Sequence, residues 1–594
     1  MTKNRPFLVA FIAAQIALGQ VLACLVLPFN LNYAAIAEPE PTMTGTKILT
    51  RRIGLPSDIN RVEAPPLEGG IGVLNTDKPI TLNGLKGRFV VLDFWTFCCI
   101  NCMHILPRLA ELEQKYDDRL TVVGIHSAKF ENEKDTSNIS KAILRYGIKH
   151  PVVNDADFKI WDAYGVKAWP TLVLIDPDGY IIGRFSGEGH TGEIAALIDR
   201  LSPFYMSRGS LKVSTAAAVS NQVEAENKLS FPGKLIISPD KKQLLISDTG
   251  HNRIIVATFK NYKEATVETI IGTGDALVRD GPLATACFNH PQGLCINPDD
   301  WNLGQRCVYV ADTGNHAVRI IDLVKQTVST RWGTGQQAPS GAMGGGSQTS
   351  LNSPWDLTLA SGGLFVAMAG SHQIWSNGKF MAPSERPQVQ SSGENLSPYA
   401  GSGREFLKDG TLADADLAQP SGITSGVSSG PAAGGTSLYI ADAEDSGIRE
   451  INMTGGTVST LIGKGLFIFG DKDGPAAEAR LQHPLGVSAD RDKLYIADSY
   501  NHKIKCLNLT TRAISTIAGT GTSGYKDGGT AQFAEPGGLF FAWSYVPVAG
   551  THNTVIQNRI YVADTNNSVI RVITLAKEPD GENLTDTLKL VWKR

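Results

Sequence analysis

Two cysteines, Cys99 and Cys102, are separated by two residues in Cys99-Ile100-Asn101-Cys102. A thiol at the N-terminus of a helix meets the positive end of the helix dipole and unpaired backbone N–H groups, and both favour the nucleophilic thiolate. In such a turn the first cysteine tends to be exposed and the second more buried. The pattern therefore predicts a redox pair in which Cys99 attacks and Cys102 resolves the mixed disulfide.

Two other uses of the cysteine pair remain open. The first is an inert structural disulfide between the same two residues. The second is half of a zinc site, although the sequence offers no second Cys-x-x-Cys and no histidine pair to complete it. We expect no metal and no cofactor apart from the redox-active Cys99–Cys102 disulfide.

The elements around the cysteines are typical of an α/β domain, which we place at residues 63–204. Apolar runs predict buried strands, whereas apolar residues at helical spacing predict helices. The expected strands lie at 89–94, 120–125 and 171–175, and a hairpin over 180–185 follows the turn Asp176-Pro177-Asp178-Gly179. The expected helices cover 102–116 and 139–146. The cysteine turn therefore joins the first strand to the first helix.

These residues resemble the thioredoxin fold, and most closely its TlpA/ResA-like branch. The resemblance implies that Asp93 is the buried carboxylate that exchanges a proton with the resolving thiol, because burial raises a carboxyl pKa. A strand-end or capping acid is the alternative for Asp93. Trp95 matches the aromatic residue beside the site. Trp169-Pro170 matches the loop whose cis-proline lies against the disulfide, so the resemblance implies that Trp95, Trp169 and Pro170 contact the substrate.

The sequence departs from the thioredoxin pattern at two places. Cys98 precedes Cys99 where relatives more often have an aromatic residue, so it is either an auxiliary thiol or a packed side chain. The dipeptide Ile100-Asn101 lacks the cationic residue or histidine that would strongly depress the pKa of a neighbouring thiol. This argues against a powerful oxidant and leaves the direction of electron flow open.

A second pattern occupies residues 229–594, where one unit recurs six times. Each unit opens on a proline-centred strand signal, and these signals lie at 231–235, 290–294, 353–357, 419–423, 483–487 and 535–539. The next strand ends in aspartate in five units (Asp248, Asp312, Asp442, Asp498 and Asp564), whereas the third unit has Met368. Four antiparallel strands repeated six times predict a closed six-bladed β-propeller.

The array resembles the NHL-repeat family, because Asn315-His316 and Asn501-His502 supply part of its eponymous triplet. We expect the strand-end aspartates to accept backbone N–H bonds locally, in the turn that follows. Cations recur on the third strand of four units, at Arg319, Arg449, Lys505 and Arg571. We interpret them as solvated strand faces, with a basic rim that attracts acidic partners as the alternative.

The fold class is therefore multidomain, an α/β thioredoxin-like fold followed by an all-β six-bladed propeller. This order, together with the double cysteine in 94–104, resembles the family of NHL-repeat-containing protein 2 and its bacterial relatives. The resemblance implies a thiol–disulfide oxidoreductase that acts on protein thiols or disulfides and uses the propeller to bind a protein partner. A redox-sensing scaffold, in which the propeller is the main functional part, is the alternative.

The first 37 of the 594 residues have the pattern of a targeting segment. Lys3 and Arg5 precede an apolar stretch over 7–31, which ends at Ala35-Ile36-Ala37. We expect either a cleaved signal peptide or an N-terminal membrane anchor, and both place the remaining chain in a periplasm or an equivalent lumen. Residues 38–62 and 205–228 are expected to be linkers. The net charge of −3 argues against binding to nucleic acid.

Overall fold

The computed structural model describes residues 62–213, 228–339, 341–378, 395–428, 435–547, 554–576 and 581–593. All of them belong to one compact unit, Asn60–Arg594. The predicted leader at 1–37 lies outside these residues. Within the described ranges, no helix is long and apolar enough to cross a lipid bilayer.

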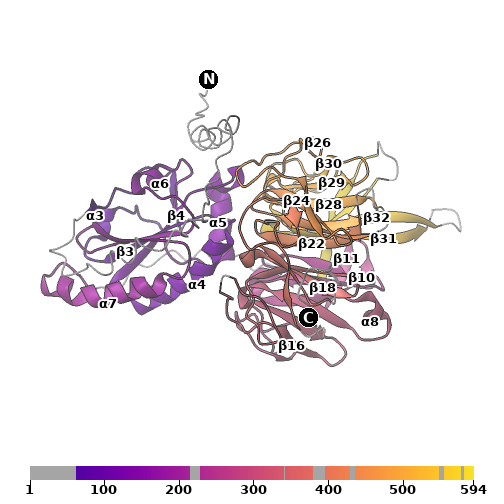
Figure 1. Ribbon diagram of the computed structural model, residues 1–594, viewed down its shortest axis with the longest axis horizontal. Coiled ribbons are helices and arrows are strands. Elements are labelled where there is room, and N and C mark those ends of the chain that lie inside the picture. The colour runs from indigo at the N-terminus through magenta and orange to yellow at the C-terminus, as the bar shows by residue number, and fades with distance from the viewer. Residues whose placement is uncertain are drawn as a thin grey trace, which may run out of the picture. The chain divides into compact units, whose positions relative to one another are not determined.

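The first domain is built on a mixed seven-stranded sheet with the order β1-β7-β6-β3-β4-β5-β2 (Figure 1). Its strands β3, β4 and β5 run parallel, and the other neighbours pair antiparallel. The strands are β1 (Val62–Glu63), β2 (Gly72–Leu74), β3 (Phe89–Trp95), β4 (Leu120–His126), β5 (Val152–Asn154), β6 (Thr171–Ile175) and β7 (Tyr180–Ser186). Right-handed parallel crossovers with helices on the sheet are typical of the thioredoxin-like fold that was predicted.

Helices cover the sheet and connect its strands. They are α3 (Leu82–Leu85), α4 (Ile100–Lys115), the 3₁₀ turn η2 (Glu131–Lys134), α5 (Thr136–Arg145), α6 (Lys159–Tyr164) and α7 (Thr191–Ser207). Strand β3 is buried along its whole length. Because strand side chains alternate between faces, Phe94 packs into one core with Trp161, whereas Trp95 packs into the other with Cys102. Asp93 shares the face of Trp95, which is the face toward α4.

The second domain is a propeller of six sheets, as predicted. From the innermost strand outward, blade 1 contains β8 (Leu235–Ile237), β9 (Gln243–Asp248), β10 (Arg253–Asn261) and β11 (Glu264–Ile271). Blade 2 contains β13 (Pro291–Ile296), β14 (Cys307–Asp312), β15 (Ala317–Asp322), β16 (Thr327–Trp332) and β12 (Gly281–Pro282). Blade 3 contains β17 (Pro354–Ala360), β18 (Gly363–Met368), β19 (Gln373–Ser376) and β20 (Ser397–Ala400).

The remaining blades repeat this order. Blade 4 contains β22 (Pro420–Val427), β23 (Thr436–Asp442), β24 (Gly447–Asn452), β25 (Thr457–Ile462) and β21 (Gly410–Thr411). Blade 5 contains β27 (Gly486–Asp490), β28 (Lys493–Asp498), β29 (Lys503–Asn508), β30 (Ala513–Ala518) and β26 (Gly474–Pro475). Blade 6 contains β31 (Pro536–Pro547), β32 (Thr554–Asp564), β33 (Val569–Thr574) and β34 (Leu584–Thr587).

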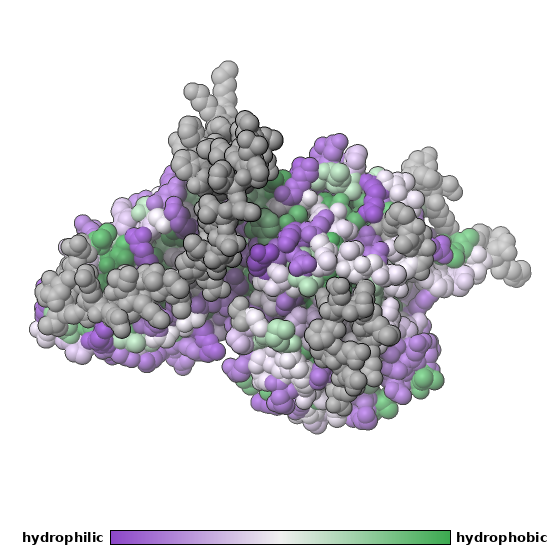
Figure 2. Space-filling view, in the orientation of Figure 1, coloured by the Kyte–Doolittle hydropathy of each residue, from purple (hydrophilic) through white to green (hydrophobic). Residues whose placement is uncertain are grey.

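The propeller closes through its last strand. Strand β35 (Lys589–Trp592) pairs parallel with β11 and becomes the outermost strand of blade 1. At the centre, β31 of blade 6 contacts β8 of blade 1, so the innermost strands form a complete ring. Figure 2 shows hydrophilic residues spread over the visible face of both domains.

The five repeated aspartates are buried, and each ties its own blade together. In blade 6, Asp564 Oδ1 accepts the backbone N–H of Ala534 at 2.7 Å, and Oδ2 accepts Arg571 Nη1 at 2.8 Å. The same pairing recurs as Asp312–Arg319, Asp442–Arg449 and Asp498–Lys505. The prediction that each aspartate accepts a backbone N–H is confirmed, but the prediction that the bond is local is wrong. The bonded N–H lies just before the first strand of the blade, not in the following turn.

The prediction that the recurring cations lie on solvated strand faces is wrong. Arg319, Arg449, Lys505 and Arg571 have no exposed surface, because each pairs with the buried aspartate of its own blade. In blade 3, Met368 and Trp375 occupy the equivalent positions and are both buried. An apolar pair there replaces the ion pair of the other blades, since a charge without its partner would be costly in a core.

Candidate functional site

The cysteine turn connects β3 to α4. Cys99 is the N-cap residue of α4 and is partly exposed, whereas Cys102 lies one turn into the helix with no exposed surface. The two thiols are within hydrogen-bonding contact, and burial together with Cys99 raises the pKa of Cys102 well above its usual value. The predicted contrast between an accessible and a buried cysteine is confirmed. Such a pair can form a mixed disulfide at Cys99 and then an internal disulfide.

Asp93 lies beneath this turn with no exposed surface. Neither of its carboxylate oxygens has a hydrogen-bond partner among the described residues. Desolvation raises the pKa of Asp93 to about 7, with His150 opposing this rise and Glu113 adding to it. The charge of Asp93 in turn raises the pKa of Cys102. An acid with this pKa beside the resolving thiol can exchange a proton near neutral pH.

Trp169 and Pro170 lie on the loop before β6. Their peptide bond is cis, as predicted. The indole N–H of Trp169 donates to the carbonyl of Ser127 at 3.0 Å, and its partly exposed ring packs in the same cluster as Cys99. Trp169 therefore borders the cysteine turn and keeps part of its surface open. Pro170 is buried.

The burial of Trp95 conflicts with the expectation that this residue contacts the substrate. Its side chain is 1% exposed and meets the ring of His126 edge-on at 5.0 Å. The physical reason is the strand alternation, which directs Trp95 into the core under α4. It is a packing residue behind the cysteine turn and offers no surface to a substrate.

Cys98 also lies inside the protein. Its side chain has no exposed surface, and its backbone N–H donates to Glu133 Oε1 at 2.9 Å. Burial, followed by the charges of Glu133 and Glu444, raises the pKa of Cys98 well above its usual value. Both effects oppose formation of a thiolate. The geometry therefore agrees with a packed side chain and gives an auxiliary thiol no route to a substrate.

Glu133 organises the loops next to the turn. Its carboxylate accepts three backbone N–H groups, from Cys98, Lys129 and Phe130, at 2.9, 2.9 and 3.0 Å. Lys129 forms a buried ion pair with Glu444 of the propeller. The cysteine turn is therefore connected to the propeller through a chain of buried polar groups.

Six propeller residues contact the α/β domain from equivalent places, because each precedes the first proline of its blade. All six have a positive φ of 43–60°, a conformation that is uncommon for residues other than glycine. Their contacts are Phe231 with Arg145, His290 with the Arg145 carbonyl, Ser353 with His104, Gln419 with the cysteine turn, His483 with Phe130, and Glu535 with Arg145. We call these six residues the pre-proline ring.

Gln419 binds the cysteine turn on both sides of Cys99. Its Oε1 accepts the backbone N–H of Ile100 at 2.8 Å, and its Nε2 donates to the carbonyl of Cys98 at 2.9 Å. Gln419 itself is 1% exposed. The side chain of Ile100 packs beside Trp355 of blade 3. The propeller therefore supplies part of the environment of the nucleophile.

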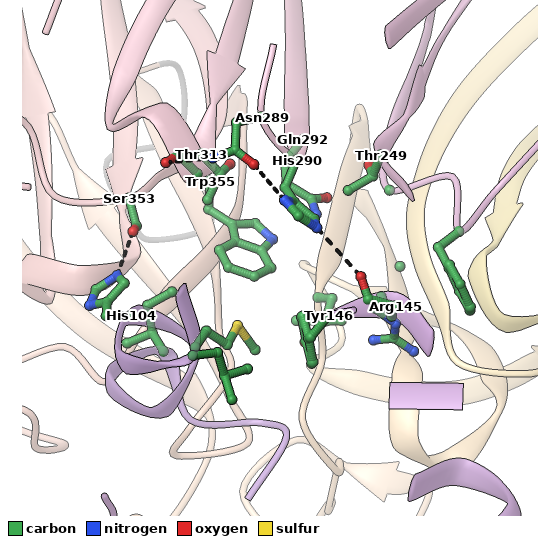
Figure 3. A pocket seen from close by; sticks show the side chains of 18 of the residues that line it. His104, Arg145, Tyr146, Thr249, Asn289, His290, Gln292, Thr313, Ser353 and Trp355 are labelled. Atoms are coloured by element: carbon green, nitrogen blue, oxygen red, sulfur yellow. Dashed lines mark hydrogen bonds between the residues drawn. The ribbon is translucent and has the colours of Figure 1, made fainter. Parts of the chain in front are cut away.

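A cavity of about 190 Å³ lies beside the turn, between α4 and the mouth of the propeller (Figure 3). Ile100, Met103, Tyr146 and Trp355 form apolar parts of its wall. Figure 3 shows the imidazole of His290 at its edge, bonded to Asn289 and to the Arg145 carbonyl. Cys99 does not line the cavity, so the space is adjacent to the reactive sulfur and not above it.

The pre-proline ring and Glu133 were missed by sequence reasoning. The proline signals were recognised, but the residue before each proline was treated as part of a structural repeat. A usable signal is its variation, because a position with five different residue types in six units, while its neighbours repeat, is not fixed by the blade alone. Among the described residues, no group of three histidine, cysteine or acidic side chains is arranged to hold a metal ion.

Comparisons with known proteins agree with both domains. A family model described as thioredoxin-like matches residues 87–181, and an NHL-repeat model matches residues 481–507. Thiol-disulfide oxidoreductase ResA of Bacillus anthracis is 31% identical over 126 residues, which cover 21% of this chain and 70% of that protein. The first domain is thus related to thiol–disulfide oxidoreductases.

Longer similarities span both domains. Protein SUPPRESSOR OF QUENCHING 1, chloroplastic, of Arabidopsis thaliana is 40% identical over 547 residues, which is 88% of this chain. The chain spans about half of that relative, 48% of its length. NHL repeat-containing protein 2 of Homo sapiens is 37% identical over 577 residues, which cover 92% of this chain and 75% of that protein. The chain therefore belongs to the NHL repeat-containing protein 2 family.

Proposed function

We propose that the chain is a thiol–disulfide oxidoreductase that acts on protein substrates through Cys99 and Cys102. The Cys99 thiolate attacks one sulfur of a substrate disulfide, which forms a mixed disulfide and releases the other substrate sulfur as a thiolate. Cys102 then gives its proton to Asp93 and attacks the Cys99 sulfur, which releases the second substrate sulfur as a thiolate; both thiolates take up protons from water. The substrate gains two electrons and the Cys99–Cys102 pair loses them. The same steps in reverse oxidise a substrate dithiol.

One observation carries this proposal. Cys99 is partly exposed at the N-terminus of α4 with Cys102 in hydrogen-bonding contact, while Asp93 lies buried without a partner. Inert disulfides do not need an unpartnered acid beneath them, and an unpaired buried carboxyl is costly. The combination therefore supports redox exchange over a structural crosslink.

Partner binding by the propeller and export of the chain belong to the same proposal. The pre-proline ring occupies one face of the propeller, and we assign a protein partner to the propeller surfaces that the α/β domain leaves free.

The proposal that the chain is exported rests on the apolar stretch at 7–31 and on Ala35-Ile36-Ala37. Sequencing the N-terminus of the mature protein tests it, because cleavage after Ala37 gives a chain that starts at Glu38.

A trapping experiment tests the oxidoreductase function. Full-length Cys102→Ser protein is mixed with a disulfide-bonded peptide, and mixed disulfides are detected by mass spectrometry. We expect a stable adduct at Cys99, because the resolving sulfur is absent. Cys98→Ser is the matched control and keeps full turnover, whereas Cys99→Ser forms no adduct and has no turnover. Unchanged peptide reduction by Cys99→Ser would overturn the proposal.

A redox-sensing scaffold is the second candidate, and the contacts of Gln419 with Cys98 and Ile100 favour it. They connect the cysteine pair to the propeller, so oxidation of the pair can alter binding by the propeller. The two candidates differ in the wild-type protein. A scaffold shows no multiple turnover with the disulfide peptide, whereas an oxidoreductase reduces many equivalents when a dithiol reductant is supplied.

A further inference from the structure

The backbone N–H of Ile100 is the first donor of helix α4. The first N–H groups of a helix have no partner within the helix, and they concentrate its positive dipole end. At the start of α4 these donors lie next to Cys99, whose own side chain makes no capping bond. Free N–H donors at a helix N-terminus, together with the positive dipole end, stabilise a thiolate there.

In this protein the donor is occupied. Gln419 Oε1 accepts the Ile100 N–H at 2.8 Å, from a position 319 residues away in the chain. The amide oxygen also carries partial negative charge, which opposes a negative sulfur nearby. Gln419 Nε2 holds the Cys98 carbonyl at 2.9 Å, so the turn is fixed on both sides of the nucleophile. Both bonds are buried and exchange poorly with water.

We propose that Gln419 is a positioning residue of the propeller that restrains Cys99 by occupying the Ile100 N–H. While Gln419 is bound, one of the helical N–H donors next to Cys99 is occupied, so the thiolate is less stabilised and reacts slowly. When Gln419 moves away, the donor becomes free and Cys99 becomes a faster nucleophile. The propeller thereby sets the reactivity of the cysteine pair.

Comparison within the pre-proline ring supports this assignment. All six residues share the same backbone conformation, and five of them contact other parts of the α/β domain, mainly Arg145, His104 and Phe130. Gln419 is the member whose side chain bonds the backbone on both sides of Cys99. The common backbone therefore serves docking, whereas the glutamine side chain serves the nucleophile.

Other charged groups surround the turn and stay unchanged in the test. Glu133, Glu444 and Lys129 act on Cys98, and Asp93 acts on Cys102. Gln419→Asn changes no charge and removes no side-chain bond of Glu133, Glu444, Lys129 or Asp93. A change in the pH dependence of the Cys99 alkylation rate is therefore attributable to the two bonds of Gln419.

The test measures the rate at which iodoacetamide alkylates Cys99 in the full chain, over a range of pH. Gln419→Asn shortens the side chain by one methylene, keeps a residue that tolerates positive φ and loses both bonds. We expect the midpoint of its rate–pH curve to fall by about one pH unit, or about tenfold faster alkylation below the midpoint. Gln419→Glu keeps the acceptor and adds negative charge, so its midpoint is expected to rise.

Gln482→Asn is the matched control. Gln482 is a buried glutamine of the propeller that accepts the N–H of Asn132, and its side chain bonds Asn132, Tyr500 and Asn501 and not the backbone on either side of Cys99. Its substitution loosens the same interface and leaves the midpoint unchanged. A Gln419→Asn curve with the wild-type midpoint, or with only a higher plateau, would overturn the proposal, because a higher plateau reports access to Cys99 and not its ionisation.

This inference rests on the proposed chemistry of Cys99, and the two can fail separately. Alkylation reports the thiol directly and needs no disulfide substrate. A shifted midpoint without peptide reduction refutes the oxidoreductase and leaves the role of Gln419 intact. Normal peptide reduction with an unshifted midpoint refutes the role of Gln419 alone.

Discussion

Buried aspartates occur in both domains, and their surroundings differ. Asp93 of the α/β domain and Asp564 of the propeller both have no exposed surface, and burial raises the pKa of Asp93 to about 7 and that of Asp564 to about 6. Asp564 is bonded to the Ala534 N–H, to Asn567 and to Arg571. Asp93 has no bonded partner among the described residues.

The comparison separates a structural acid from the acid that we propose to exchange a proton. Burial alone is common to both, so burial is not the signal. The partners are the signal, because the Ala534 N–H and Arg571 favour the charged form of Asp564 and oppose the rise in pKa that burial causes. An unpartnered carboxyl beside a thiol can take up and release a proton. Substitutions at the two sites should therefore change stability in opposite directions.

The largest effect is expected from Arg571→Met. It removes the cation next to Asp564 and leaves a buried charge without its partner, so we expect a loss of about 3 to 5 kcal/mol in the free energy of unfolding. Thermal or urea denaturation measures it. Lys242→Met removes one positive charge from the exposed surface of the same domain and should leave stability almost unchanged. Equal effects of the two variants would refute the structural role of the pair.

Asp93→Asn should instead stabilise the protein. The folded-state pKa of Asp93, about 7, lies above the value of an unfolded aspartate, about 4, so the folded chain binds the extra proton and wild-type stability falls as pH rises between these values. The variant avoids this loss and should gain at most about 4 kcal/mol relative to wild type, fully developed above pH 7. Denaturation at pH 4 and pH 8 measures the difference. The account is contradicted if the stability of Asp93→Asn minus that of wild type is smaller at pH 8 than at pH 4.

The same substitution should slow the resolving step. Without a carboxylate to accept the proton of Cys102, release of a peptide from the mixed disulfide at Cys99 should be about 100-fold slower near pH 7.5. Stopped-flow measurement of peptide release reports this step. The wild-type rate should rise with pH through about 7, and Asp93→Asn should lack that rise. Alkylation of Cys99 serves as the control and should change little.

The smallest effect is expected from Asp527→Asn. This carboxylate also bonds Arg571, at 2.7 Å, but its side chain is 49% exposed. Water screens the pair, so the free energy of unfolding should fall by no more than about 1 kcal/mol. A loss as large as that of Arg571→Met would show that exposure does not distinguish the two carboxylates of Arg571.

Much of the site could be predicted from local sequence. The spacing of Cys99 and Cys102 after an apolar strand predicts a cysteine turn at the start of a helix. The alternation of side chains along that strand puts Asp93 on the face that this helix covers. The six proline signals locate the blades. The short strands β1, β2 and β5 were not predicted, because two or three residues are too few to show a period.

The remaining features depend on tertiary contacts. Gln419 reaches Ile100 across 319 residues, and only the folded interface brings them together. Trp95 was assigned to the substrate by resemblance, and its burial follows from the helix that covers β3. Arg319 and its equivalents alternate with apolar residues as a solvated face does. Their burial depends on a carboxylate on the neighbouring strand, which a single-strand pattern does not contain.

The redox pairing of the cysteines is the most direct test of the central claim. Full-length protein is equilibrated with reduced and oxidised glutathione, the free thiols are blocked, and the peptides are mapped by mass spectrometry. The account predicts one internal disulfide, Cys99–Cys102, with a loss of two hydrogens and with Cys98 recovered as a blocked thiol. Recovery of Cys99 and Cys102 as free thiols under all ratios, or a disulfide that contains Cys98, would contradict it.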